Sequence, residues 1–446
     1  MFSTADTIVA IATPPGRGGI GVVRLSGSDA HAIARLLLAT DIALQPRRAT
    51  FAKIGSPDQL LDEAVVTLFP APHSYTGDDI VEVSAHGSPV VLQGIVTAAI
   101  AAGARLAEPG EFTLRAFLNG RIDLPQAEAV ADLIDAVTPL QARAAFDQLD
   151  GTLTGRISQI DASLFDLIAR LEASVDFPDE GYHFIAPAQL VAALDALLSA
   201  TASLLAEGKR GRLVREGLHV AIVGKPNVGK SSLFNALAGC ERAIVTPVPG
   251  TTRDLVTETV DVNGLRVTLV DSAGIRATDD CVESIGVDLA RSAMHVADVA
   301  LVVIDASFPL DADDEAILRE TAHRRRVVVA NKTDVCETGA ASFLAVSAKT
   351  GAGLDALRDE LESTLDDDVL RDRPAITNVR HLDLVDRAQR AIARAREALG
   401  ERGAAQSEEF VLADLQAARD AFEEISGRRT SDDVLAHIFA RFCIGK

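Results

Sequence analysis

The chain has few cysteines and no long apolar run, and each absence argues against a class of function. Its four cysteines are Cys240, Cys281, Cys336 and Cys443, which lie far apart and form no Cys-x-x-Cys pair. This argues against a zinc or dithiol site and makes reduced thiols the expectation. No uninterrupted apolar run is long enough to span a bilayer, and the first residues lack the basic and apolar regions of a signal peptide. We therefore expect a cytoplasmic protein that is not held in a membrane.

Positive charge is also scarce in this chain. Lysine and arginine number 43 against 64 aspartates and glutamates, which gives a net charge of −21 at pH 7. The field of the whole protein therefore repels nucleic acid, and an RNA contact needs a local basic patch or a partner's surface. Two short basic clusters, 209–212 and 324–326, are interpreted as solvated helix ends or linkers rather than RNA contacts.

A glycine-rich loop is the strongest positive signal. Residues 224–232 read Gly-Lys-Pro-Asn-Val-Gly-Lys-Ser-Ser, after an apolar stretch at 218–223 and before a helix-like stretch at 233–237. A strand, a tight turn and a helix N-terminus direct several backbone N–H groups at one point, which suits a polyphosphate. Lys230 is expected to reach the outer phosphates and the Ser231 hydroxyl to ligate Mg²⁺. The alternative, a chance glycine-rich turn, is disfavoured by the flanking pattern.

A second motif indicates which base is bound. Residues 331–334 read Asn-Lys-Thr-Asp and follow a buried strand pattern at 327–330. A carboxylate at Asp334 can accept both the ring N–H and the amino hydrogens of guanine, whereas adenine offers no such donor pair. We therefore predict GTP, with an ATPase as the disfavoured alternative. The Ser-Ala-Lys segment at 347–349 resembles the loop that closes on the guanine carbonyl in GTPases.

Two segments between these motifs are candidate switch loops. Asp271 ends a strand pattern and can hold Mg²⁺ through water, while the N–H of Gly274 can meet the γ-phosphate. Thr252, in the earlier segment, is the expected second hydroxyl ligand to Mg²⁺. A solvated turn is the alternative for each segment, and the order and spacing of the motifs disfavour it.

The usual water-orienting glutamine is absent. Ile275 follows Gly274, where many GTPases place that glutamine, and isoleucine cannot hydrogen-bond the attacking water. Another group must then assist hydrolysis. Asn227 offers a side-chain carbonyl near the phosphates and, with backbone carbonyls of the first switch segment, could cage a monovalent cation. We hypothesise stimulation by potassium.

The predicted nucleotide contacts lie in the phosphate loop, both switch segments and the two base segments. They are Asn227, Val228, Gly229, Lys230, Ser231, Ser232, Thr246, Pro247, Val248, Pro249, Gly250, Thr251, Thr252, Asp271, Ser272, Ala273, Gly274, Asn331, Lys332, Asp334, Ser347, Ala348 and Lys349.

Apolar periodicity organises the rest of the chain. Short apolar runs and Gly/Pro turns predict a small α+β domain at 1–120. Apolar residues three and four apart predict amphipathic helices at 121–214 and 373–446. Because an α/β block at 215–372 separates the helical blocks, we predict a Ras-like P-loop GTPase domain inserted into one helical domain. The fold class is thus α/β plus all-α.

The chain resembles the bacterial MnmE (TrmE) family of tRNA-modifying GTPases over its whole length. The resemblance rests on Ala-Thr-Pro-Pro-Gly-Arg-Gly-Gly at 12–19, Arg-Ala-Phe-Leu-Asn-Gly-Arg at 115–121, Val-Asp-Phe-Pro at 175–178, the GTPase motifs and the terminal Cys-Ile-Gly-Lys at 443–446. Any small GTPase could share the phosphate loop, whereas the two ends together are specific.

The resemblance implies a function in tRNA modification. The family works with an FAD-dependent partner, in a heterotetramer-type complex, to add a carboxymethylaminomethyl or related aminomethyl group at C5 of the wobble uridine, position 34. A tetrahydrofolate derivative, the 5,10-methylene or 5-formyl form, binds the N-terminal domain, which also forms the homodimer. The GTPase domains meet during turnover with potassium at their contact. A GTP-dependent switch in ribosome assembly, without one-carbon chemistry, is the alternative.

The resemblance also assigns roles to residues. It implies that folate contacts Arg24, Glu82, Arg121 and Lys446. The implied potassium ligands are Asn227 and the carbonyls of Thr246, Val248 and Thr251, and the implied magnesium ligands are Ser231 and Thr252. The implied catalytic residues are Lys230, Asp271, Glu283 and Cys443. Glu283 matches the residue that positions water from the second switch. Two positions depart from the pattern: Arg121 stands where some members have lysine, and Pro249 adds a second proline to the potassium loop.

Overall fold

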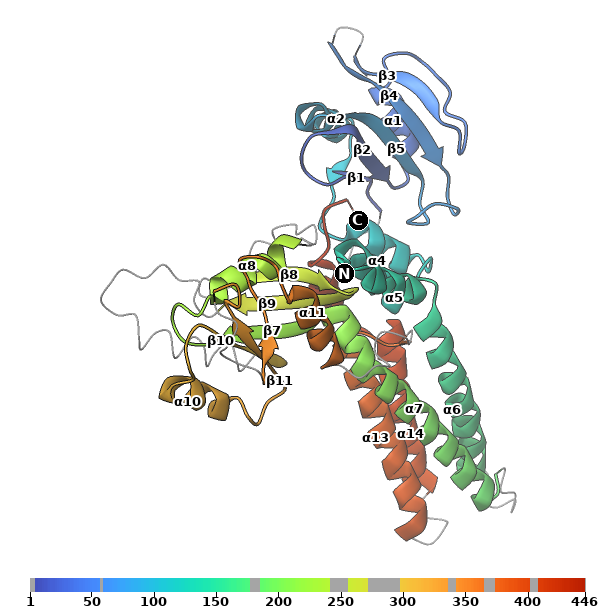
Figure 1. Ribbon diagram of the computed structural model, residues 1–446. Helices are drawn as coiled ribbons and strands as arrows, with labels where there is room; N and C mark the ends of the chain where they lie inside the picture. Colours follow the sequence, from blue (N-terminus) through green and yellow to red (C-terminus); the bar gives the residue numbers. More distant parts are fainter. Residues whose placement is uncertain are drawn as a thin grey trace. The chain divides into compact units, whose positions relative to one another are not determined.

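The computed structural model describes residues 5–56, 59–176, 185–240, 256–271, 297–335, 342–364, 374–401 and 408–445. Contacts divide the chain into two compact units (Figure 1). The N-terminal unit comprises Met1–Ala131, Leu149–Ser158 and Arg419–Lys446, and the second unit comprises Asp132–Gln148 and Gln159–Ala418. The predicted domain boundaries at 120, 214 and 372 remain predictions.

The N-terminal unit is built on a six-stranded sheet in the order β3-β4-β5-β2-β1-β6. Its strands are β1 (Ile8–Ile11), β2 (Gly18–Ser26), β3 (Thr50–Ser56), β4 (Gln59–Phe69), β5 (Ile80–Gly87) and β6 (Arg105–Leu106). All neighbours pair antiparallel except β1 and β6. Every second side chain of β5, such as Val81 and Val83, is buried, as expected for a sheet with one covered face.

Helices α1 (Ala30–Leu37) and α2 (Pro89–Ala101) supply the apolar side chains that cover this sheet. Ile33 and Leu37 of α1 and Ile95 of α2 are buried among the inward residues of β2 to β5. The mixed α+β character predicted for the first domain is therefore confirmed.

The same unit contains a small helical cluster formed from distant parts of the sequence. Helix α3 (Glu111–Leu118), the first turns of α4 (Leu124–Asp135) and helix α15 (Asp432–Phe439) share one apolar core. Phe439 and Phe442 pack with ring centroids 5.3 Å apart. This core fixes the C-terminal segment onto the N-terminal unit.

The second unit contains long helices and the second sheet. The helices are α5 (Pro139–Leu149), α6 (Thr152–Asp176), α7 (Pro187–Glu216), α13 (Val379–Glu401) and α14 (Glu408–Ser426), of which α5, α6 and α14 begin or end in the other unit. Helices α7 and α13 run side by side (Figure 1). The buried residues of α13 recur at the predicted spacing of 384, 388, 392 and 395, which confirms this amphipathic helix.

Helix α7 is also long and apolar enough to cross a membrane, with a mean hydropathy of 1.6 over its best window. Because Asp195 interrupts its apolar residues, this helix contains no uninterrupted apolar run long enough to span a bilayer. One face of α7 is buried in the unit, including Leu194 and Leu197. Its Asp195 forms an ion pair of 2.9 Å with Arg396 of α13. These contacts are those of a helix that packs one face against its neighbours in the unit.

The second sheet has the order β12-β11-β10-β7-β9-β8. Its strands are β7 (Leu218–Val223), β8 (Val256–Val262), β9 (Leu265–Asp271), β10 (Val299–Asp305), β11 (Arg326–Asn331) and β12 (Leu344–Ala345). All pairs are parallel except β8 with β9. The chain places β8 and β9 on one side of β7 and β10, β11 and β12 on the other. The carboxyl end of β7 is therefore the usual ligand position of such a sheet.

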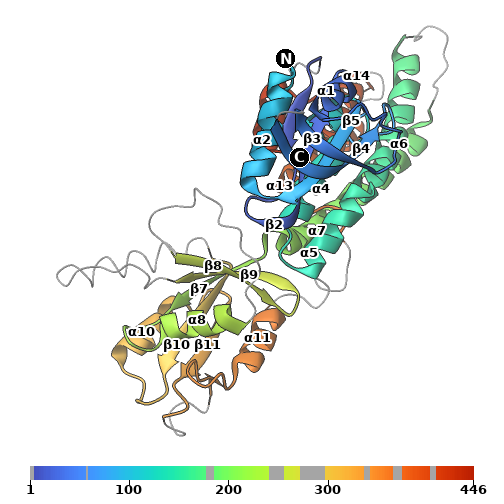
Figure 2. The same cartoon turned by 90° about the horizontal axis from the view of Figure 1, so that it is seen from above.

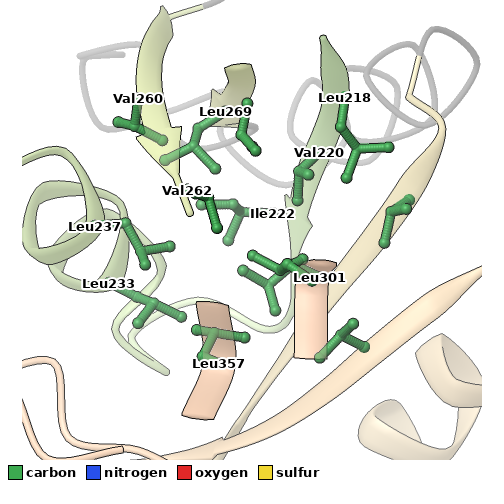
Figure 3. Close-up of a cluster of buried hydrophobic side chains, with 14 of the residues drawn as sticks. Leu218, Val220, Ile222, Leu233, Leu237, Val260, Val262, Leu269, Leu301 and Leu357 are labelled. Atoms are coloured by element: carbon green, nitrogen blue, oxygen red, sulfur yellow. The ribbon is translucent and has the colours of Figure 1, made fainter. Parts of the chain in front are cut away.

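Helices cover both faces of the second sheet (Figure 2). Helices α8 (Lys230–Cys240) and α11 (Leu354–Ser363) pack on one face, where Leu233, Leu237 and Leu357 meet Ile222 and Leu301 (Figure 3). Helix α10 (Ala312–Glu320) packs on the other face. Since this sheet lies between α7 and α13 in the chain, the predicted insertion of a P-loop GTPase fold into a helical domain is confirmed.

The chain enters and leaves this inserted part at one place. A Cβ on Gly211 of α7 would overlap the backbone carbonyl of Ile376, and one on Gly208 would overlap the side chain of Leu382. Only glycine allows the two segments to approach so closely.

Candidate functional site

The phosphate loop adopts a backbone that requires its glycines. Gly224 has φ +154° and Gly229 has φ +95°, and both are packed closely. A Cβ on Gly224 would overlap the carbonyl of Val303, and one on Gly229 would overlap the side-chain amide of Asn331. The glycine spacing of the motif is therefore a steric requirement of the fold.

Lys230 lies at the centre of this loop. It is the first residue of α8, and its ammonium donates to the carbonyls of Gly224 at 2.9 Å and Lys225 at 2.7 Å. Ser231 and Ser232 follow in the same helical turn. The N-terminus of α8 and the Lys230 ammonium together place positive potential where the loop closes, which favours a polyphosphate.

Asn331 joins the phosphate loop to the base-recognition loop. The residue is 1% exposed at the end of β11. Its side-chain amide donates to the carbonyl of Val228 at 2.9 Å, and its side-chain oxygen accepts from the N–H of Ala348 at 3.1 Å. Asn331 thus organises both loops from a buried position.

Asp334 and Ser347, which the sequence predicts to lie at the guanine base, are in direct contact. The Ser347 hydroxyl donates to Asp334 Oδ1 at 2.7 Å, and the Lys349 ammonium lies 3.9 Å from Asp334 Oδ2. Thr333 donates its hydroxyl to the carbonyl of Val346 at 2.9 Å. The structure therefore brings together the two base segments predicted from the sequence.

Lys332 connects the base motif to a residue that sequence reasoning missed. Its ammonium donates to the carbonyl of Asn227 and to Asp305 Oδ2, each at 2.7 Å. Burial would raise the pKa of Asp305, but hydrogen bonds from Lys332 and Ser307 outweigh it and lower that pKa. The signal available in the sequence was an aspartate directly after the apolar residues of β10, at the carboxyl edge of the sheet.

Several predicted residues lie outside the described part of the chain. These are Thr246, Pro247, Val248, Pro249, Gly250, Thr251, Thr252, Ser272, Ala273, Gly274, Ile275, Glu283 and Lys446. Asp271 is described by its backbone, which pairs with Ile222 beside the start of the phosphate loop. Asn227 adopts φ +63° within that loop.

The N-terminal unit holds a second constellation around Arg24. Arg24 on β2 and Glu82 on β5 face each other in the sheet register and form an ion pair with distances of 2.8 and 2.9 Å. The Arg24 guanidinium lies 5.6 Å from the ring centre of Tyr75 and 5.7 Å from that of Phe112. Cation–π attraction and the ion pair hold this guanidinium between two rings.

The C-terminal segment reaches the same constellation. Arg24 Nη1 donates to the carbonyl of Gly445 at 3.4 Å, and Ile444 pairs with Pro109 as an isolated bridge. The exposed Cys443 offers its carbonyl to the N–H of Gly110 at 3.4 Å. Residues 24 and 445, at opposite ends of the chain, are thereby brought together.

Arg121 lies beside the loop that carries Tyr75. Its side chain lies against Gly77, two residues after Tyr75. Among the described residues its guanidinium has no hydrogen bond or ion pair, and the residue is exposed. Arg121 is thus a cation open to an anionic ligand.

A network of ion pairs surrounds the buried Arg115, three residues after Phe112. Arg115 is 1% exposed and donates to Asp6 Oδ1 at 2.7 Å and to Glu111 Oε1 at 3.0 Å. Arg105 donates to the same two carboxylates, each at 2.6 Å. Burial would raise the pKa of Glu111, but the hydrogen bond from Arg105 outweighs it, with those of the Glu108 N–H and Arg115, and lowers that pKa.

Comparisons with known proteins cover the whole chain. A family model described as "GTP-binding protein TrmE N-terminus" matches residues 7–121, and one described as "MnmE helical domain" matches residues 124–443. The tRNA modification GTPase MnmE of Koribacter versatilis is 46% identical over 99% of this chain and 99% of its own length. The protein of that name from Bordetella petrii is 44% identical over 100% of this chain and 99% of its own length. The one from Chloroflexus aurantiacus is 43% identical over 99% of this chain and 100% of its own length.

A solved structure of Era with MgGDPNP and nucleotides 1506–1542 of 16S ribosomal RNA is 28% identical to this chain. The match covers 39% of this chain and 66% of that one with a TM-score of 0.28, which is too low to support an argument.

Proposed function

The chain belongs to the MnmE family of tRNA modification GTPases, and we propose that it acts with an FAD-dependent partner on the wobble uridine of certain tRNAs. As a member of this family it is a GTP hydrolase that takes part in tRNA modification. The proposed product carries a carboxymethylaminomethyl or related aminomethyl group at C5 of uridine 34. The proposed place of action is the cytoplasm.

The observation that carries the proposal is the constellation around Arg24. A GTPase that served only as a switch would need the nucleotide site alone. Here the N-terminal unit also joins the Arg24–Glu82 pair, two aromatic rings and the segment that bears Cys443. Such a set has the chemistry to hold a flat, hydrogen-bonding ring with an anionic tail.

The side chains of this constellation fit a tetrahydrofolate. When bound, a tetrahydrofolate derivative supplies the one-carbon unit. The Glu82 carboxylate can accept ring N–H groups, and the rings of Tyr75 and Phe112 offer apolar surface beside them. The open guanidinium of Arg121 can pair with the carboxylates of the tail. If the full chain failed to bind a tetrahydrofolate in an equilibrium titration, the switch in ribosome assembly would be favoured instead.

The nucleotide site would use its own residues for binding and a cation for hydrolysis. Lys230 and the N-terminus of α8 would bind the phosphates, Asp334 would select guanine, and Ser231 would ligate magnesium. Thr252 would be the second magnesium ligand. Potassium, when bound, offsets the negative charge that develops on the phosphates, as an arginine does in other GTPases. Asn227 and the carbonyls of Thr246, Val248 and Thr251 would hold it where two GTPase domains of a homodimer meet.

We expect GTP hydrolysis to depend on potassium and on protein concentration. A cation in the role of an arginine finger contributes about a thousandfold or more to kcat, so turnover in sodium buffer should be at least about a hundredfold slower. Initial rates measured in potassium and sodium chloride at equal ionic strength test this, with dilution to separate the copies. Equal rates in both salts would remove potassium and pairing from the proposal.

The tRNA step is tested by nucleoside analysis. We expect tRNA from cells that lack this chain to lose the C5-modified wobble uridine and to regain it when the chain is restored. A Glu82→Gln chain should bind GTP normally yet fail to restore the nucleoside, because Glu82 belongs to the folate site alone. An unchanged wobble uridine in the deleted cells would exclude the proposed function.

A further inference from the structure

Lys225, the second residue of the phosphate loop, is held by the N-terminus of α10. Its ammonium lies 2.5 Å from Asp311 Oδ2 and 2.8 Å from Asp314 Oδ2. Asp311 is the N-cap of α10, and its side chain accepts from the N–H groups of Asp313 and Asp314, each at 3.1 Å. We call the residues Lys225, Asp311 and Asp314 the lysine clamp.

Backbone N–H groups of α10 hold the two carboxylates of the lysine clamp. Asp314 is 5% exposed, and its carboxylate also accepts from the N–H of Asp311 at 3.3 Å. The hydrogen bond from Lys225 lowers the pKa of Asp311 to about 2. A buried carboxylate that lost its cation would be an uncompensated charge, so the structure favours the closed clamp.

The backbone of Lys225 faces the opposite way, toward Lys230. The carbonyl of Lys225 accepts from the Lys230 ammonium at 2.7 Å, and the neighbouring carbonyl of Gly224 accepts at 2.9 Å. One residue therefore connects α10 to the lysine that binds phosphate. The side chain of Lys225 is committed to the carboxylates and does not point into the loop as a second phosphate ligand would.

We propose that Lys225 is a positioning residue for GTP binding: the clamp fixes its backbone, and its carbonyl in turn holds Lys230 at the place from which it meets the phosphates. The clamp prepares the loop before the nucleotide arrives. Its loss adds the cost of ordering the loop to each binding event, while the bound complex keeps the same reacting groups. The clamp thus sets affinity and leaves the chemical step unchanged.

Substitution of Lys225 in the full chain tests the proposal. We expect Lys225→Met to raise the Kd for GTP and for GDP, and the KM for GTP, by about tenfold, because the loop must then be ordered at each binding event. The kcat at saturating GTP should change less than about twofold. Lys225→Arg keeps the charge and the donors and should restore affinity to within about twofold. Lys209→Met, at an exposed lysine of α7, is the matched control and should change nothing.

A merely structural role gives a different result. It would lower the thermal midpoint and the active fraction, and hence the apparent kcat, without changing the Kd of the folded molecules. Asp311→Asn is a second test for the case in which Lys225→Met does not fold. It should keep the helix cap, because asparagine caps a helix as well as aspartate does. We expect this variant to weaken GDP binding about threefold. An unchanged Kd in Lys225→Met, or in Asp311→Asn where the former does not fold, would overturn the proposal, as would a failure of arginine to restore affinity.

Discussion

The Asp334→Asn chain is expected to bind GTP about a thousandfold more weakly and to prefer xanthosine triphosphate. The carboxylate accepts two donors of guanine, and each charge-assisted hydrogen bond contributes about 1.5–3 kcal/mol. Asparagine replaces one acceptor oxygen by an NH₂ group, which faces the guanine donors without a partner. Xanthine carries a carbonyl in place of the amino group and so matches the new donor. The Ser347 hydroxyl bond to Oδ1 can persist, which keeps the loop in place.

Titration calorimetry with both nucleotides measures this exchange. Asp355→Asn, at an aspartate whose side chain is 96% exposed on α11, is the control and should keep the preference for GTP. A variant at 334 that still preferred GTP over xanthosine triphosphate would show that the base is read by another residue. The second base segment would then be the place to search.

The second large effect is expected on stability, from Arg115→Met. Arg115 is buried between Asp6 and Glu111 and also donates to the carbonyl of Asp6 at 2.6 Å. Arg105 still pairs with both carboxylates in this variant, so neither charge is left without a cation. We therefore expect a loss of about 1–3 kcal/mol, from the buried acceptors that Arg115 no longer satisfies. Hydrogen exchange of the β1 and α3 amides in the full chain measures this local loss. Phe112, which lies next to Glu111, should lose its fixed position beside Arg24.

An exposed ion pair of the same kind provides the control. Arg35 and Asp41 lie 2.7 Å apart with side chains 53% and 84% exposed, so Arg35→Met should cost less than about 1 kcal/mol. Equal protection losses in the two variants would contradict the assigned role of the buried network.

The pH dependence of the network has a definite sign. Hydrogen bonds, from Arg105 above all, lower the pKa of Asp6, and the pKa of Glu111 is lowered as well. The stabilisation is therefore present above about pH 4, the ordinary range of carboxyl groups, and is lost as the pH falls through the lowered folded-state values. The difference in hydrogen-exchange protection between the wild type and Arg115→Met should therefore become smaller as the pH falls below about 4.

Local patterns predicted the parts of this molecule that depend on neighbours in the sequence. Residues close together in the sequence were enough to predict the phosphate loop, the Asn-Lys-Thr-Asp motif and the periodic apolar positions of α13. The fold class followed because two helical blocks flank one α/β block. The guanine segments are 13 residues apart, and their meeting at Asp334 and Ser347 could be expected from their order.

Contacts between distant residues could not be derived in this way. Lys225 and Asp311 are 86 residues apart, and Arg24 and Gly445 are 421 apart. A lysine in a glycine-rich loop and an aspartate before a helix have many possible partners, and only the packing of the strands selects one. The strand order of both sheets and the hydrogen bonds of Asn331 to two loops also depend on contacts between distant residues, so the sequence did not predict them.

The close approach of Gly211 to Ile376 makes the GTPase part a separable cassette. Because the incoming and outgoing segments touch, a short linker could close the gap between α7 and α13 after excision of everything between them. The excised piece would then keep its sheet and the described residues that are predicted to contact the nucleotide. The P-loop fold thus interrupts the helical domain at one place only, which is the geometry that tolerates an inserted domain.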